Sequence, residues 1–132
     1  MIFLDTSAIY ALADNADPNH ARAGKIFERL VTERTALMTH NYVLVESFAL
    51  LQHRLGLGSA IAFSDESRNF EIVWVDQQTH REAASKWAKR GRTLSFVDHV
   101  SFVVMERMQI TTAFAFDSDF VAAGFDVLNA AR

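Results

Sequence analysis

Four acidic residues stand where a carboxylate could take part in chemistry, because each follows or interrupts a run of apolar side chains. They are Asp5, Glu46, Asp98 and Asp117. An apolar run that stops at an acid is typical of a buried strand ending at a helix start. In open α/β sheets, ligands bind at the carboxyl ends of the strands. We therefore expect Asp5, after residues 1–4, and Asp117, after residues 111–116, to lie at one edge of a sheet.

Glu46 is the most informative of the four, because it falls in an apolar helical stretch. Its neighbours three and four positions away are Tyr42, Val43, Ala49 and Leu50. A carboxylate on a core-facing stripe must be neutralised, paired or bound to a metal. Arg54 is two turns away on the same helix and cannot easily be its partner, so the sequence favours a functional role for Glu46.

The other acids also have a structural interpretation as helix caps. Asp5, Thr6 or Ser7 could begin the first helix, and Asp117 or Asp119 a late one. Asp98 follows Ser95 at the spacing of a capping box. For Asp98, capping and catalysis are compatible. Of Asp117 and Asp119, we expect one to be a ligand and the other a cap or a supporting group.

Carboxylates that converge on one pocket repel one another unless a cation holds them. An all-oxygen ligand set favours Mg²⁺ or Mn²⁺ over zinc. Cysteine is absent, and the five histidines show no metal-ligand spacing. His99, beside Asp98, is better explained as a packed or solvated side chain. Such a metal generates a nucleophile from water and stabilises charge on a phosphoryl oxygen.

A basic stretch precedes Asp98 and could grip phosphates on either side of a cut. It contains Lys86, Lys89, Arg90 and Arg92. A solvated helix end whose cations complement the helix dipole explains it equally well. The formal net charge of −3 argues against a broad nucleic-acid-binding surface.

The elements that must position these residues alternate along the chain. The patterns predict strands over residues 1–4, 36–39, 70–75, 111–116 and 126–128. They predict helices over residues 6–13, 18–32, 42–55, 59–69, 77–90, 96–108 and 118–123. In these predictions Pro18 takes the first position of its helix, Asn41 caps the third helix, and Ser59 opens the fourth. Alternating strands and helices indicate an α/β fold with a parallel sheet covered on both faces.

At 132 residues, the chain is expected to form one domain over residues 1–132. Neither a signal segment nor an apolar stretch of membrane-spanning length is evident, which favours a soluble cytoplasmic protein. The apolar residues Leu55, Leu57, Ile61 and Phe63 suggest a self-association or partner surface, although core packing explains them equally well.

Four ordered segments together resemble the successive acidic motifs of PIN-domain nucleases, in particular VapC-type toxins of bacterial toxin-antitoxin pairs. They are residues 2–7, 41–46, 94–98 and 115–120. The resemblance spans nearly the whole chain. It implies a single-domain three-layer α/β/α fold with a five-stranded parallel sheet. It also implies a Mg²⁺- or Mn²⁺-dependent endoribonuclease that acts on structured or single-stranded RNA.

The resemblance also implies roles for individual residues. The acidic cluster would comprise Asp5, Glu46, Asp98 and Asp117. Asp5 and Asp98 would bind the metal directly, and the other two would complete its shell or orient the attacking water. Thr6 or Ser7 would supply a hydroxyl that hydrogen-bonds within the site, and Asp119 an additional acid. Toxins of this kind are usually homodimers held by a cognate antitoxin, so both partners are expected here.

Two other classes of protein remain open at this point. A receiver or aspartyl-phosphatase domain is also α/β with acids at strand ends, but a phosphatase would have a second acid where Ser7 stands. A receiver would need paired acids near the first strand and a lysine after a late strand. A non-catalytic RNA- or protein-binding module would require Glu46 to be paired within the protein rather than linked to a metal.

Overall fold

The computed structural model describes residues 1–90 and 94–128, apart from the side chain of Arg90. Its centre is a sheet of five parallel strands in the order β3-β2-β1-β4-β5. The strands are β1 Ile2–Leu4, β2 Leu37–His40, β3 Glu71–Val73, β4 Thr112–Phe114 and β5 Asp126–Val127. The first strand of the chain lies in the middle, where Phe3 pairs with Met38 of β2 and Ala113 of β4. The predicted α/β class and five-stranded parallel sheet are confirmed.

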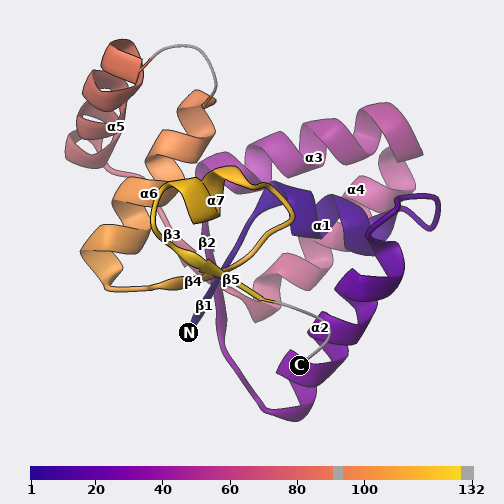
Figure 1. Cartoon of the computed structure of the whole chain (residues 1–132). Coiled ribbons are helices and arrows are strands. Elements are labelled where there is room, and N and C mark those ends of the chain that lie inside the picture. The colour runs from indigo at the N-terminus through magenta and orange to yellow at the C-terminus, as the bar shows by residue number, and fades with distance from the viewer. Residues whose placement is uncertain (91–93, 129–132) are drawn as a thin grey trace.

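Helices cover both faces of this sheet. They are α1 Thr6–Ala13, α2 His20–Thr32, α3 Asn41–Leu55, α4 Leu57–Glu66, α5 Gln77–Arg90, α6 Phe96–Met108 and α7 Asp119–Ala122. Helices α1 to α4 lie on one side of the sheet and α5 and α6 on the other (Figure 1). This follows from the strand order, since right-handed crossovers run outward from β1 to β3 and then return across the sheet to β4. The three-layer α/β/α architecture is confirmed.

The core is built on aromatic side chains at the central strands. Phe3 and Phe114 are fully buried, as is Phe120 of α7. The ring of Phe3 lies 6.0 Å from that of Phe120, and Phe102 of α6 meets Phe120 edge-on at 5.1 Å. This packing fixes the carboxyl end of β1 between α6 and α7, and therefore the position of the residue that follows it.

The start of α2 differs from its prediction. The helix begins at His20, and Pro18 lies in the preceding turn. In that turn the Asp17 carboxylate accepts from the Asn19 N–H, and the Asp17 carbonyl accepts from the His20 N–H. These hydrogen bonds hold residues 17–19 in a turn, so the helix cannot begin at the proline.

The predicted cap of α3 is also wrong. The cap is His40, whose Nδ1 accepts from the backbone N–H of Val43 at 3.3 Å. Asn41 is the first helical residue, and its Oδ1 instead accepts from the backbone N–H of Val75 at 2.7 Å. Asn41 therefore links α3 to the segment after β3.

Helix α4 starts earlier than predicted, at Leu57 instead of Ser59. Gly56 separates it from α3 with a φ of 97°, a backbone conformation that favours glycine. The helix ends at Glu66 and is followed by a 3₁₀ turn, Ser67–Asn69. Leu57 and Ile61 are more than half exposed, so core packing does not explain them. Within the described residues, no helix is both long and apolar enough to cross a membrane.

Candidate active site

Asp5 lies directly after β1 and is buried at the carboxyl edge of the sheet. Its Oδ2 accepts two hydrogen bonds from Ser7, from the backbone N–H at 3.0 Å and from Oγ at 2.6 Å. Ser7 Oγ in turn accepts from the backbone N–H of Phe116 at 2.9 Å. Ser7 thereby fixes the Asp5 carboxylate to the chain that leaves β4. Strands β1 and β4 flank the point where the strand order reverses, which is the usual ligand site of such a sheet.

Glu46 approaches the same edge from α3. Its Oε1 accepts from Thr6 Oγ1 at 2.6 Å, and Thr6 Oγ1 accepts a longer bond of 3.4 Å from Ser47. The predicted core-facing position is only partly correct, because Glu46 is half-buried and its neighbour Val45 is 65% exposed. Arg54 is directed elsewhere, with its guanidinium 5.2 Å from the centre of the Tyr10 ring. Glu46 is thus held by a hydroxyl.

Asp98 both caps α6 and faces the other acids. Ser95 Oγ accepts from the Asp98 N–H at 3.1 Å, and Asp98 Oδ2 accepts from the Ser95 N–H at 3.3 Å, so the predicted capping box is present. Asp117 Oδ1 accepts from the Asp119 N–H at 2.9 Å. One carboxylate oxygen each from Asp98, Asp117 and Asp119 lies within 4.8 Å of the others. The geometry therefore places both Asp117 and Asp119 in the cluster and does not separate a ligand from a cap.

The electrostatics join Asp5 and Glu46 to this cluster. Burial raises the pKa of Asp5 to about 6, against the hydrogen bonds from Ser7, and the charges of Asp117 and Glu46 raise it further. Burial, followed by the charges of Asp5 and Asp117, likewise raises the pKa of Asp98 to about 6. Partial loss of hydration raises the pKa of Asp119, and the neighbouring Asp117 carboxylate raises it further. These carboxylates lie close enough to disfavour one another's charge.

The donor set fits a hard divalent cation. The clustered ligand atoms are carboxylate oxygens, which Mg²⁺ and Mn²⁺ prefer, and neither histidine nor cysteine belongs to the cluster in the described part of the chain. Ionised carboxylates this close together need a positive charge to offset their repulsion, and a bound cation supplies it. Asp5, Asp98, Asp117 and Asp119 are the side chains that could hold such an ion, with Glu46 beside them.

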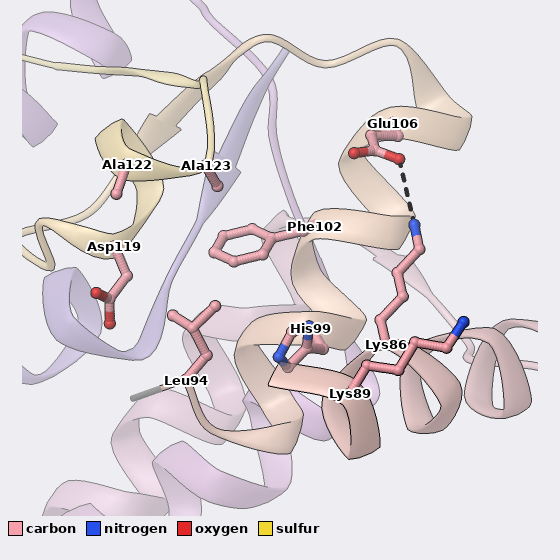
Figure 2. A pocket seen from close by; sticks show the side chains of 9 residues that line it. All are labelled: Lys86, Lys89, Leu94, His99, Phe102, Glu106, Asp119, Ala122 and Ala123. Carbon is pink, nitrogen blue, oxygen red and sulfur yellow. Dashed lines mark ion pairs between the residues drawn. The ribbon is translucent and has the colours of Figure 1, made fainter. Parts of the chain in front are cut away.

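A cavity of about 670 Å³ opens next to the acids, between α5, α6 and α7. Figure 2 shows Asp119 and Ala122 of α7 and the following Ala123 on one side and Lys86 and Lys89 of α5 on the other. Lys86 Nζ lies 3.7 Å from Glu106 of α6. Two of the four predicted phosphate-binding cations therefore line this cavity. Arg92 and the side chain of Arg90 fall outside the described residues.

His40 supports the site, a role that could not be predicted directly from the sequence. Its ring is fully buried, with Nε2 2.8 Å from Ser101 Oγ. Because Nδ1 accepts from the Val43 N–H, Nε2 carries the proton and donates to Ser101, which donates to the Val97 carbonyl. Burial lowers the pKa of His40 to about 3, so the ring is neutral. The only signal in the sequence is a histidine between a buried strand and a helix.

His99, the histidine next to Asp98, is a packed side chain. It is 4% exposed, and its ring meets that of Phe102 edge-on at 6.4 Å. This burial agrees with the expectation of a packed or solvated side chain and selects the packed alternative.

Comparisons with known proteins agree with this architecture. The profile of the PIN domain matches residues 2–126. Two Mycobacterium tuberculosis proteins, from strains CDC 1551 / Oshkosh and ATCC 25618 / H37Rv, are named 23S rRNA-specific endonuclease VapC20. Each is 40% identical to this chain over 129 residues, which cover 95% of both sequences.

Solved structures show the same likeness. The crystal structure of Mycobacterium tuberculosis VapC20, described as a sarcin-ricin loop cleaving toxin, superposes with a TM-score of 0.85 at 36% identity. The match covers 98% of this chain and 99% of the VapC20 chain. DNA-bound VapBC from Salmonella typhimurium and FitAcB from Neisseria gonorrhoeae each reach a TM-score of 0.68. These matches cover 98% and 100% of this chain, respectively, and 99% of each matched chain. At 14% and 18% sequence identity, the two proteins share the fold of this chain.

The fold and the acidic site define an α/β protein with carboxylates gathered at the switch point of a parallel sheet. The chain belongs to the PIN-domain family of nucleases, and within it to the VapC-type toxins. This membership excludes the receiver and phosphatase alternatives.

Proposed function

We propose that this protein is a metal-dependent endoribonuclease and the toxin of a toxin-antitoxin module. The observation that carries the proposal is the convergence of four acids from separate elements on one sheet edge. They are Asp5 after β1, Glu46 on α3, Asp98 on α6 and Asp117 after β4. The structural roles of Asp5 and Asp98 as caps do not require the other acids beside them.

The proposed substrate is 23S rRNA, cut in the sarcin-ricin loop. Support comes from the VapC20 proteins, which are named for this activity and are 40% identical over nearly the full length of this chain. Relatives at this level share the backbone that carries the acids, as the TM-score of 0.85 indicates.

The proposed metal is Mg²⁺, with Mn²⁺ able to substitute. When bound, such an ion lowers the pKa of water and stabilises negative charge on a phosphoryl oxygen. Asp5 and Asp98 are proposed as direct ligands, with Asp117 and Glu46 completing the shell or orienting water. Asp119 is a further candidate, because its carboxylate lies in the same cluster as those of Asp98 and Asp117.

The protein's own contribution is to hold these carboxylates in fixed orientations before RNA arrives. Ser7 fixes Oδ2 of Asp5, and Thr6 fixes Oε1 of Glu46. The backbone N–H of Asp119 fixes Oδ1 of Asp117. One oxygen of each of these three carboxylates is thereby fixed, and the rigid geometry of the carboxyl group sets the direction of the other oxygen. Little reorganisation is therefore needed when charge develops in the transition state.

The test is cleavage of purified ribosomes and of a sarcin-ricin loop hairpin by wild type and Asp5→Asn. Reactions contain Mg²⁺, Mn²⁺ or a chelator, and the products are mapped at nucleotide resolution. We expect wild type to make one metal-dependent cut in the loop, and Asp5→Asn to lose at least about 100-fold in rate. Asp65→Asn, at an exposed position on α4, is the matched control and should cut like wild type.

Equal cutting by Asp5→Asn would overturn the acidic site. Binding of RNA by both proteins without any cut would favour the non-catalytic binding module. A metal-dependent cut elsewhere in RNA would keep the enzyme and replace the substrate.

The proposed protein partners are a cognate antitoxin and a second copy of this chain. Leu57 and Ile61 are 58% and 52% exposed and lie one helical turn apart on α4, so they form an apolar stripe that a second copy could cover. We expect wild type to sediment as a dimer and Ile61→Asp as a monomer of unchanged fold. A cognate antitoxin should co-purify with the toxin and inhibit its cleavage.

A further inference from the structure

The cavity beside the acidic cluster is not needed to hold the acids, yet it has the size and lining of a ligand pocket. Its volume of about 670 Å³ falls within the range of pockets that enclose small organic molecules, about 300–1,000 Å³. It lies between α5, α6 and α7 and is lined by side chains from all three. Ordinary packing of the three helices does not require a space of this size.

The lining combines two kinds of surface (Figure 2). Leu94, Phe102 and Ala123 contribute an apolar part. Lys86 and Lys89 contribute a cationic part on the opposite side, and both are exposed to solvent. A nucleotide has matching parts, because its base has apolar faces and its phosphate carries a negative charge. Unpaired bases of RNA are commonly recognised in this way, splayed out of the stack.

The position of the cavity relates it to the acids. Asp119 lines the cavity, and its carboxylate also lies within 4.8 Å of those of Asp98 and Asp117. A group seated in the cavity is therefore a neighbour of whatever lies over the acidic cluster. A nucleotide in this pocket would belong to the same RNA strand as the phosphodiester presented to the acids.

We propose that this cavity, between Lys86 and Lys89 of α5 and Ala123 directly after α7, binds one unstacked nucleotide of the RNA adjacent to the cleaved bond. Lys86 contacts its phosphate, and Leu94 and Phe102 contact its base. This deepens the ribonuclease function proposed above and rests on it. It makes Lys86 a substrate-binding residue and Glu106 a residue that opposes binding.

The opposite effects expected for Lys86 and Glu106 follow from their ion pair. Glu106 lies 3.7 Å from Lys86, and both side chains are about half exposed. An exposed pair of this kind is weak, so a phosphate can take Lys86 from Glu106. Glu106 would also repel that phosphate. Removing the charge of Glu106 should therefore strengthen RNA binding, and removing the charge of Lys86 should weaken it.

The experiment measures binding of a sarcin-ricin loop RNA hairpin to Asp5→Asn protein, which is not expected to cut it, at fixed Mg²⁺. Lys86→Met, Glu106→Gln and Glu82→Gln are added to this background. Glu82 is the matched control, because it forms an α5–α6 ion pair with Arg107 at 3.0 Å and does not line the cavity. Its substitution changes the net charge as Glu106→Gln does.

We expect Lys86→Met to raise the Kd about fivefold and to reduce the slope of log Kd against log salt by about one. Glu106→Gln should lower the Kd about threefold, and Glu82→Gln should leave it within a factor of about two. If Lys86→Met and Glu106→Gln both weaken binding, the pair is structural and the proposal is wrong. If neither changes the Kd, the phosphate does not contact Lys86.

A second variant tests the volume of the cavity. Ala123→Phe, at an exposed position after α7, fills the pocket from the side opposite the lysines. In the otherwise wild-type enzyme it should raise KM at least about fivefold with kcat nearly unchanged, as expected when binding alone is lost. An unchanged KM would overturn the pocket. Absence of cutting by wild type would instead count against the proposed function, because the Kd measurements require no cleavage.

Discussion

Asp5 shows how a residue suited to metal binding is costly to the protein without the metal. Its carboxyl is buried, and the charges of Asp117 and Glu46 add to the effect of burial. The raised pKa means that the folded state holds a proton that the unfolded chain releases near pH 4. The hydrogen bonds from Ser7 offset only part of this penalty.

We therefore expect Asp5→Asn to stabilise the metal-free protein. The folded-state pKa of about 6 exceeds the ordinary value of 3.8 for an aspartate, so the penalty is absent below pH 4 and complete above pH 6. A shift of this size corresponds to about 3 kcal/mol at most. Thermal unfolding with chelator should show a higher Tm for Asp5→Asn at pH 7 and little difference at pH 4. A lower Tm at pH 7 would show that Ser7 stabilises the charge more than burial opposes it.

A second prediction about a single residue concerns the hydroxyl of Thr6. Thr6→Val keeps the shape of the side chain and removes the 2.6 Å hydrogen bond to Glu46. A hydrogen bond to a charged group contributes about 1.5–3 kcal/mol, so cleavage should fall at least tenfold with the fold retained. Thr6→Ser, which can donate the same bond, should recover most of the rate. Equal activity of Thr6→Val and wild type would remove Glu46 orientation from the proposed mechanism.

At the scale of the elements, His40 joins α3 to α6. Its ring caps α3 through Val43 and donates to Ser101 of α6, so the helices that carry Glu46 and Asp98 share one anchor. The ring also lies 5.7 Å from that of Phe3 in the central strand. A shift of this one side chain would move two acids relative to Asp5.

We expect His40→Asn to keep the cap of α3 and lose the link to Ser101, at a cost of about 2 kcal/mol at pH 7. The cost should shrink as the pH falls. The folded-state pKa of about 3 lies below the ordinary 6.5, so the wild type loses stability as its unfolded chain becomes protonated below pH 6.5. Urea unfolding at pH 7 and pH 5 measures this. Asn41→Ala removes the bond to Val75, and its cost should not depend on pH.

The order of the elements could be predicted from the sequence, but some of their starts could not. The strands and helices follow from local patterns, such as the apolar run before Asp5. Their alternation along the chain is enough to predict the parallel sheet. The cap of α3 depends on the geometry of the chain leaving β2, which lets His40 reach Val43 and turns Asn41 toward Val75. Both residue types suit a cap, and only the folded backbone decides between them.

The same distinction applies to the site. The acids were predictable because each ends an apolar run or sits in an apolar helix. The cavity was not, because it is formed by α5, α6 and α7 together. Lys86 and Lys89 were recognisable as a basic stretch, whereas the contribution of Glu106 depends on the packing of α5 against α6.

At the scale of the whole molecule, the net charge of −3 limits how RNA can be bound. A protein that is negative overall gains little from long-range attraction, so its affinity must come from a few local contacts. If Lys86 and Lys89 supply the phosphate contacts, a plot of log KM against log salt should rise with a slope of about 1.4. The slope is measured from cleavage kinetics at KCl concentrations from about 50 to about 300 mM. A slope above about 4 would require additional cations along the RNA path.

The placement of the first strand in the middle of the sheet has a consequence for synthesis of the protein. Asp5 is made before β4, yet its N–H bonds to the carbonyl of Phe114, and Ser7 bonds to Phe116. These contacts span more than a hundred residues, so they form late in folding. A nascent chain on the ribosome cannot complete the site until residues 112–117 have been translated and can join the sheet. The nuclease proposed here would thus stay inactive toward the ribosome that is making it until β4 has been translated and has joined β1.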